Sequence, residues 1–130
     1  MPPRSRKIIA LLAGALAYLA ILYRFLSYSE RNRMHAAPYV LFAGVVLIIG
    51  FVLAVGEVNS RFKVASFVVL GVWAGLSIVI AIDTAEDPTN HNLLPFEYVY
   101  MGVLACPAYL GAAIAGVVHR ATRRDPPARS

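Results

Sequence analysis

Residues 34–56 read MHAAPYVLFAGVVLIIGFVLAVG and contain no Asp, Glu, Lys or Arg. Three further uncharged runs cover residues 8–23, 64–82 and 98–118. The hydrocarbon core of a bilayer is about 30 Å thick and is crossed by roughly 20 apolar residues in a helix, and a charge placed inside it is costly. The four runs therefore predict an all-α polytopic membrane protein whose spans form an antiparallel four-helix transmembrane bundle.

The composition agrees with this interpretation. Hydrophobic residues make up 59% of the 130 residues and charged residues 15%, against about 25% charged residues in a typical soluble domain. Only short loops and tails remain outside the uncharged runs, so residues 1–130 are predicted to form a single membrane domain. Its spans are expected at roughly residues 8–27, 37–56, 64–82 and 95–119.

The positions of the basic residues predict the orientation. With four spans, nine of them fall on one side of the membrane: Arg4, Arg6, Lys7, Arg61, Lys63, Arg120, Arg123, Arg124 and Arg129. The other side receives Arg24, Arg31 and Arg33. Because Lys and Arg concentrate in cytoplasmic segments, we expect both basic tails, residues 1–7 and 120–130, to lie in the cytoplasm. The first span is expected to remain as an uncleaved anchor.

Small residues recur at four-residue spacing in three spans: Ala13 and Ala17, Gly71 and Gly75, and Ala108, Ala112 and Gly116. Such spacing lets helix backbones approach closely in a bilayer. It fits either a homodimer seam or packing between helices of one chain, and the many helices available within the chain favour the second interpretation. Pro107 is predicted to bend the fourth span, because it removes one hydrogen bond and crowds the carbonyl of Val103.

The stretch between the third and fourth spans, residues 83–97, reads DTAEDPTNHNLLPFE. Oxygen-rich loops of this kind can bind Ca²⁺, and His with carboxylates can bind Zn²⁺ or Mn²⁺. The spacing matches no established metal motif, however, and Asx-Pro and Thr-Asn pairs are also ordinary turn formers. The loop lacks Gly and Ser and contains two prolines. We therefore predict a rigid acidic loop that caps the outer end of the bundle, with no metal and no other cofactor.

Candidate site residues on this outer face are Asp83, Asp87, His91, Asn92 and Glu97, together with Arg31, Arg33 and His35 from the loop before the second span. Opposite charges at a partly dehydrated surface are expected to pair and to dock one loop on the other; separately solvated loops are the alternative. Glu97 is expected in the first turn of the last helix. We expect it to contact Arg24, Arg31 or Arg33, or a polar group of residues 90–92.

Several function classes are disfavoured. No Asp, Glu, Lys, Arg or His lies in the middle of a span, whereas proton-coupled transporters and ion pumps place such groups there. The chain contains no GxSxG, HExxH or phosphate-loop motif, and its basic residues lie at membrane boundaries rather than in a soluble nucleic-acid-binding segment. The single cysteine, Cys106, lies within the fourth span and is predicted to be an inert packing thiol.

These observations predict a small integral protein of the cell (inner) membrane with an accessory or structural role. Its expected partners are the lipid bilayer and either another membrane protein or a second copy of the chain, and no nucleic acid. The alternative is a membrane-interface enzyme, or a metal or lipid-headgroup site, on the outer face. In that case His91 and Glu97 act as acid–base groups or ligands, and Arg31 or Arg33 holds a lipid phosphate. The sequence does not decide whether the protein is an enzyme.

Overall fold

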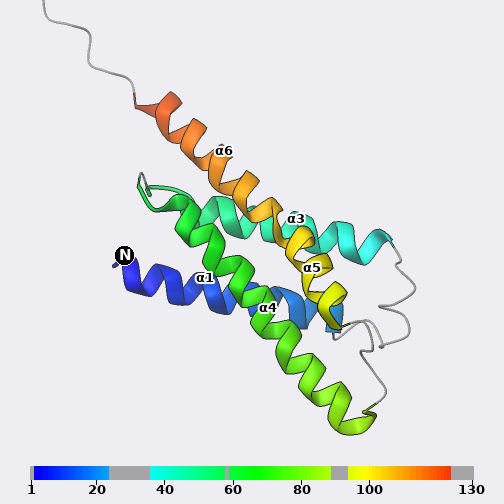
Figure 1. Cartoon of the computed structure of the whole chain (residues 1–130). Helices are drawn as coiled ribbons and strands as arrows, with labels where there is room; N and C mark the ends of the chain where they lie inside the picture. The colour runs from blue at the N-terminus through cyan, green and yellow to red at the C-terminus, as the bar shows by residue number, and fades with distance from the viewer. Residues whose placement is uncertain (1, 24–35, 58, 89–93, 124–130) are drawn as a thin grey trace, which may run out of the picture.

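The computed structural model describes residues 2–23, 36–57, 59–88 and 94–123, and every regular element in these ranges is helical (Figure 1). In chain order the elements are α1 (Pro3–Tyr18), the π-helical turn η1 (Leu19–Tyr23), α3 (Ala36–Ala54), α4 (Arg61–Glu86), α5 (Leu94–Ala105) and α6 (Pro107–Thr122). They make up four helices long and apolar enough to cross a membrane: Pro3–Tyr23, Ala37–Ala54, Arg61–Glu86 and Pro95–Thr122. The all-α class and the four candidate spans are confirmed. The predicted end of the first span, at residue 27, lies outside the described residues.

Helices α1 and α4 cross at glycines, where their backbones touch. A Cβ atom added at Gly14 of α1 would overlap the carbonyl oxygen of Val68, and one added at Gly71 of α4 would overlap the carbonyl oxygen of Leu11. Gly75, one turn further along α4, also lies against α1. Residues without a side chain are therefore required where these two helices meet. The interpretation that Gly71 and Gly75 pack against another helix of the same chain is confirmed.

Helices α3 and α6 meet in the same way. A Cβ atom at Gly50 of α3 would overlap the carbonyl oxygen of Ala108, and one at Gly111 of α6 would overlap the carbonyl oxygen of Leu47. Ala108 and Ala112, two of the small residues noted in the sequence, are fully buried. Two glycine-lined crossings thus join α1 to α4 and α3 to α6.

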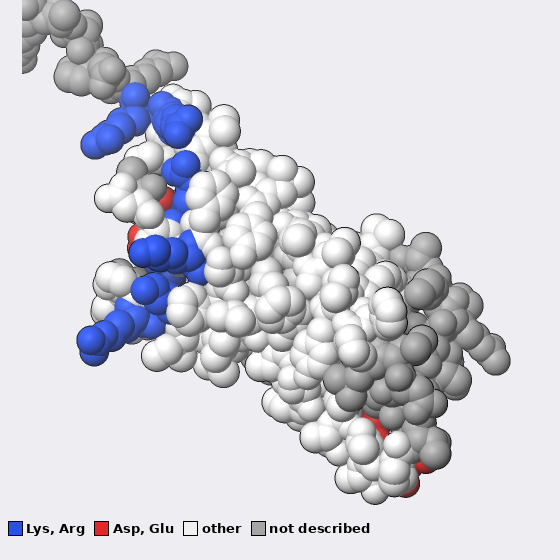
Figure 2. All heavy atoms as spheres, viewed as in Figure 1, with Lys and Arg blue, Asp and Glu red and all other residues white. Residues whose placement is uncertain are grey.

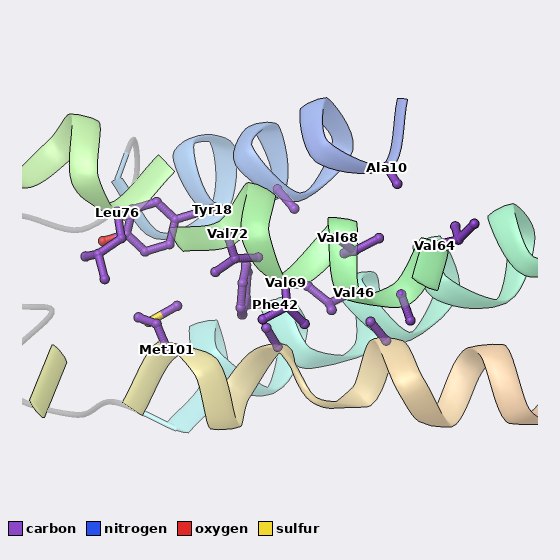
Figure 3. Packing of buried hydrophobic residues seen from close by; sticks show 14 of the residues in the cluster. Ala10, Tyr18, Phe42, Val46, Val64, Val68, Val69, Val72, Leu76 and Met101 are labelled. Atoms are coloured by element: carbon purple, nitrogen blue, oxygen red, sulfur yellow. The ribbon is translucent and has the colours of Figure 1, made fainter. Parts of the chain in front are cut away.

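The core lies between these two pairs of helices and consists mainly of small and β-branched side chains (Figure 3). Its largest fully buried members are Phe42, Leu22, Val46, Val64, Val68, Val72 and Val79. Tyr18 packs edge-on against Phe42, with ring centroids 6.4 Å apart, and so joins α1 to α3. Because lipid is as apolar as these side chains, close packing rather than exclusion of water stabilises such contacts within a bilayer.

Polar side chains connect α4 with the fourth span at two levels. The hydroxyls of Ser66 and Tyr109 are 2.7 Å apart, those of Ser77 and Tyr98 are 2.6 Å apart, and Trp73 Nε1 donates to the carbonyl of Tyr98 at 2.9 Å. Each serine donates its only hydroxyl hydrogen to a carbonyl of its own helix, so each tyrosine is the donor to its serine. The later serine of α4 pairs with the earlier tyrosine, so the two segments run in opposite directions along this seam.

The Ser66–Tyr109 hydrogen bond can be tested by a double-mutant cycle. Ser66→Ala and Tyr109→Phe, made singly and together, should show a coupling free energy of about 1 kcal/mol in unfolding measured in detergent micelles. Thr122→Ala supplies the control, because Thr122 Oγ1 donates only within its own helix, to the carbonyls of Val118 and His119. Tyr109→Phe combined with Thr122→Ala should be additive. Additivity of the Ser66 and Tyr109 changes would contradict the pairing.

The fourth span is interrupted at Pro107, where α5 ends and α6 begins. Proline has no N–H to donate to the carbonyl of Val103, and that carbonyl instead accepts the N–H of Cys106 at 3.1 Å. The predicted loss of a helix hydrogen bond at Pro107 is thus confirmed, and the span divides there into two helices, while the predicted bend stays a prediction. Cys106 itself is exposed on the outside of the span, so the prediction of a packing thiol was wrong.

The charged residues separate to the two ends of the molecule. Figure 2 shows Lys and Arg gathered at one end and most Asp and Glu at the other, with an uncharged surface between them. We call the basic end the inner end and the acidic end the outer end, after the orientation predicted from the sequence. The amino ends of α1 and α4 and the carboxyl ends of α3 and α6 supply the inner end. The outer end holds Asp83, Glu86, Asp87 and Glu97.

Candidate functional site

The structure describes three of the eight residues that the sequence placed at an outer-face site. Asp83 and Asp87 lie at the end of α4, and Glu97 lies in the first turn of α5. The other five, Arg31, Arg33, His35, His91 and Asn92, lie outside the described residues, as do Arg24 and residues 90–92. The convergence of all eight on one site therefore stays a prediction.

Asp83 was predicted to open a loop, but α4 continues past Ile82 to Glu86, so Asp83 is part of a helix. Its side chain is only 7% exposed and is the one buried charged residue among those described. Its backbone carbonyl accepts the N–H of Asp87 at 2.9 Å, which closes the last turn of α4. A carboxylate removed from water requires polar partners, and Asp83 engages in at least one such interaction.

Asp87 and Glu97 differ from Asp83 in exposure. Asp87 follows the last residue of α4 in extended conformation and is exposed. Glu97 is half-buried, in the helix turn predicted from the sequence, where the amino end of α5 favours a negative charge. Each engages in a polar or electrostatic interaction.

Within the ranges that the structure describes, no three His, Cys, Asp or Glu side chains lie close enough together to hold a metal ion.

Glu97→Ala is expected to destabilise the protein more than Glu86→Ala. Glu97 is half-buried and engaged in an interaction, whereas Glu86 is exposed. The loss of a partly buried charged interaction should cost about 2 kcal/mol, and the exposed change under about 0.5 kcal/mol. Thermal unfolding of both variants in one detergent measures the difference. Equal losses would mean that Glu97 is simply solvated and that the outer cap does not stabilise the helices.

Sequence reasoning missed a polar cluster at the inner end. Arg6 of α1 donates from Nη1 to the backbone carbonyls of Leu53 and Val55, both at 3.0 Å. Its Nε lies 3.3 Å from Oε1 of Glu57, and the two side chains are only 16% and 20% exposed. Ser60 donates from Oγ to Oε2 of Glu57 at 2.5 Å. We call Arg6, Glu57 and Ser60 the inner clamp.

Local backbone structure explains why the inner clamp forms there. The last carbonyls of a helix have no partner within it and carry partial negative charge, so a guanidinium is favoured beside them. Helix α3 ends at Ala54, and Gly56 turns the chain with φ 82°, a conformation that favours glycine. Ser60 precedes α4 and makes no side-chain cap there; its hydroxyl donates to Glu57. The clamp thereby joins α1, the end of α3 and the start of α4.

One sequence signal pointed to this cluster. Glu57 is the only acidic residue between positions 31 and 82, and it lies on the side predicted to carry nine basic residues. A single carboxylate among so many cations is expected to pair, although the sequence alone does not select Arg6 as its partner.

Comparison of the chain with protein-family models, with curated proteins and with solved structures gave no match.

The two ends differ in what they can do chemically. The inner clamp holds Arg6 by an ion pair with Glu57 and by two hydrogen bonds to backbone carbonyls, so it can fix the helices against one another. At the outer end, Glu86 and Asp87 are exposed acidic residues and Asp83 is a buried one. Carboxylates of this kind can accept hydrogen bonds from a partner or attract a cation.

Proposed function

We propose that this chain is a small four-span integral protein of the cell (inner) membrane with an accessory or structural role. Its spans form an antiparallel four-helix bundle, both termini lie in the cytoplasm, and the acidic outer end is capped by residues 83–97 and meets a partner. The observation that carries this proposal is a broad surface without charged side chains between two ends of opposite charge (Figure 2), on which many large apolar side chains are exposed.

Every span contributes exposed large apolar side chains to that surface. Leu12 and Leu16 in the first, Ile48 and Val52 in the second, Ile78 in the third and Val103 and Leu110 in the fourth are each at least half exposed. A soluble monomer rarely exposes large contiguous apolar patches. Contact with lipid accounts for such a surface, and the positive charge at one end supports a cytoplasmic inner end.

The interior supports an accessory role rather than transport. Within the described spans, charged side chains are confined to the ends, and the glycine crossings bring helix backbones into contact in the middle. Transporters and pumps instead place ionisable groups near the midplane, beside a path for the substrate. A tightly packed apolar interior suits a protein that holds or stabilises a neighbour.

Quantitative co-purification tests the accessory role. The tagged full chain, extracted in mild detergent after cross-linking, is expected to retain a membrane-protein partner or a second copy in a fixed ratio. Glu86→Gln with Asp87→Asn should reduce that ratio, because both residues are exposed at the outer end, whereas Arg123→Gln at the exposed inner end should not. A chain that stays alone after cross-linking, and that turns over a substrate, would contradict the proposal.

The alternative, an outer-face enzyme or a metal or lipid-headgroup site, predicts a different result. Elemental analysis of the purified protein would then find a stoichiometric divalent metal that is lost in His91→Ala and in Asp87→Ala. Asp83, whose backbone carbonyl accepts the N–H of Asp87, supports this alternative, because its carboxylate is buried and burial strengthens the interaction of a carboxylate with a cation. Protein without bound metal or lipid would leave residues 83–97 with the capping role.

A further inference from the structure

At the inner end, Lys7 of α1 lies over an aromatic ring of α4, and a further cation lies one turn away on each of these two helices. Nζ of Lys7 lies 5.8 Å from the centroid of the Phe67 ring. Lys63 is exposed and precedes Phe67 by one turn on the same side of α4, and Arg4 is exposed and precedes Lys7 by one turn of α1. We call Lys7, Lys63 and Phe67 the lysine corner.

The cations of the lysine corner have no acidic partner among the described residues. Glu57 is the only described acid at the inner end, and the inner clamp engages it through Arg6 and Ser60. Arg4, Lys7 and Lys63 form no ion pair with any residue that the structure describes. Among the residues that the structure describes, the lysine corner is therefore a patch of positive charge without an acidic partner, whereas Arg6 pairs with Glu57.

An apolar strip adjoins this charge on the side of the spans. Leu70 follows Phe67 by one turn of α4 and is 45% exposed, and Ile8, next to Lys7, is 59% exposed. A soluble acidic partner would leave this strip uncovered. A phospholipid matches both parts, because its phosphate can lie between the ammonium groups while an acyl chain lies along the strip.

We propose that the lysine corner binds the phosphate of an anionic phospholipid, with one acyl chain along Phe67 and Leu70. This proposal rests on the proposed insertion of the chain in a membrane. Each lysine close to an anionic headgroup strengthens binding about five-fold, so the two lysines together favour an anionic lipid about 25-fold over a lipid with no net charge.

Native mass spectrometry of the full chain in a non-ionic detergent tests the proposal. The protein is titrated with phosphatidylglycerol, with phosphatidylcholine of the same acyl chains, and with inorganic phosphate. Phosphatidylglycerol should bind about 25-fold more tightly than phosphatidylcholine. Lys63→Gln should weaken the binding of phosphatidylglycerol about five-fold, and Lys7→Gln combined with Lys63→Gln should weaken it about 25-fold. Lys63→Arg keeps the charge and should change this affinity little. The matched control is Arg123→Gln, an equal loss of charge at the exposed end of α6, which should change binding less than two-fold.

Three results would overturn the proposal. Equal binding of the two lipids would remove the anion preference. An equal loss in Arg123→Gln and Lys63→Gln would show that the field of the whole inner end, rather than the lysine corner, attracts the lipid. Competition by inorganic phosphate at the same concentration as the lipid would show an ion site without a role for the acyl chain.

Carbonate extraction of membranes separates this inference from the proposed function, since a chain that resists extraction but lacks lipid preference contradicts the lipid site alone.

Discussion

Gly71→Ala should lower the free energy of unfolding by about 3 kcal/mol. The added methyl group would overlap the carbonyl oxygen of Leu11 in α1. That atom belongs to a helix backbone, which cannot rotate away as a side chain can, so α1 and α4 must separate along their crossing. Separation also loosens the opposite side of the crossing, where Gly14 lies against the carbonyl of Val68. The change is measured by denaturant titration in mixed detergent micelles.

Gly44 supplies the matched control for this prediction. It lies inside α3, and a Cβ atom added there would meet no atom within 4 Å. Gly44→Ala should therefore be neutral or stabilise the protein by up to about 1 kcal/mol, because alanine favours a helix more than glycine does. Gly111→Ala should resemble Gly71→Ala, since it disturbs the second crossing. Equal stability of the Gly71 and Gly44 variants would mean that the helices do not touch where the structure places them.

Arg6→Ala should cost about 3 kcal/mol, through loss of the inner clamp. The change removes two hydrogen bonds to the carbonyls of Leu53 and Val55 and leaves Glu57 with only Ser60. Because Glu57 is four-fifths buried, its carboxylate then lies in a poorly solvated site without its cation. Unfolding in detergent measures the loss. Arg6→Lys should recover only part of it, since an ammonium group lacks the planar fork that reaches carbonyls and carboxylate together.

Arg4 is the matched control for Arg6. It lies on the same helix and carries the same charge, but it is exposed and has no ion-pair partner among the residues that the structure describes. Arg4→Ala should change the free energy of unfolding by less than about 0.5 kcal/mol. Similar losses in Arg4→Ala and Arg6→Ala would indicate a general effect of positive charge at this end, and the specific role of the clamp would be wrong.

The number of spans and their approximate positions could be predicted because they depend on a local property. A run without charge, such as residues 64–82, is visible without knowing what surrounds it. The break at Pro107 is local in the same sense, because the missing N–H belongs to that residue. The end of α4 was placed too early, since Asp83 was assigned to a loop because of its charge, whereas the helix buries it.

Contacts between distant residues could not be read in this way. Gly71 was noted for its spacing, but its contact with Leu11 depends on how two helices are placed against each other. Arg6 lies near the start of α1, whereas Glu57 follows the end of α3, so the two residues are far apart in the chain. Nothing near Arg6 in the sequence distinguishes it from Arg4 or Lys7. For the outer-face site, the sequence supplied a set of residues with suitable chemistry but no geometry to join them.

Cysteine accessibility tests most directly whether α4 crosses the membrane in the proposed orientation. In a Cys106→Ala background, single cysteines are introduced at Asn59, exposed between α3 and α4, and at Glu86, exposed at the outer end of α4. Cells with a permeabilised outer membrane are treated with a membrane-impermeant maleimide before and after lysis. We predict that Glu86→Cys is labelled in unlysed cells and Asn59→Cys only after lysis. Labelling of Asn59→Cys in unlysed cells would contradict the proposed orientation, and labelling of both would contradict the membrane-spanning arrangement itself.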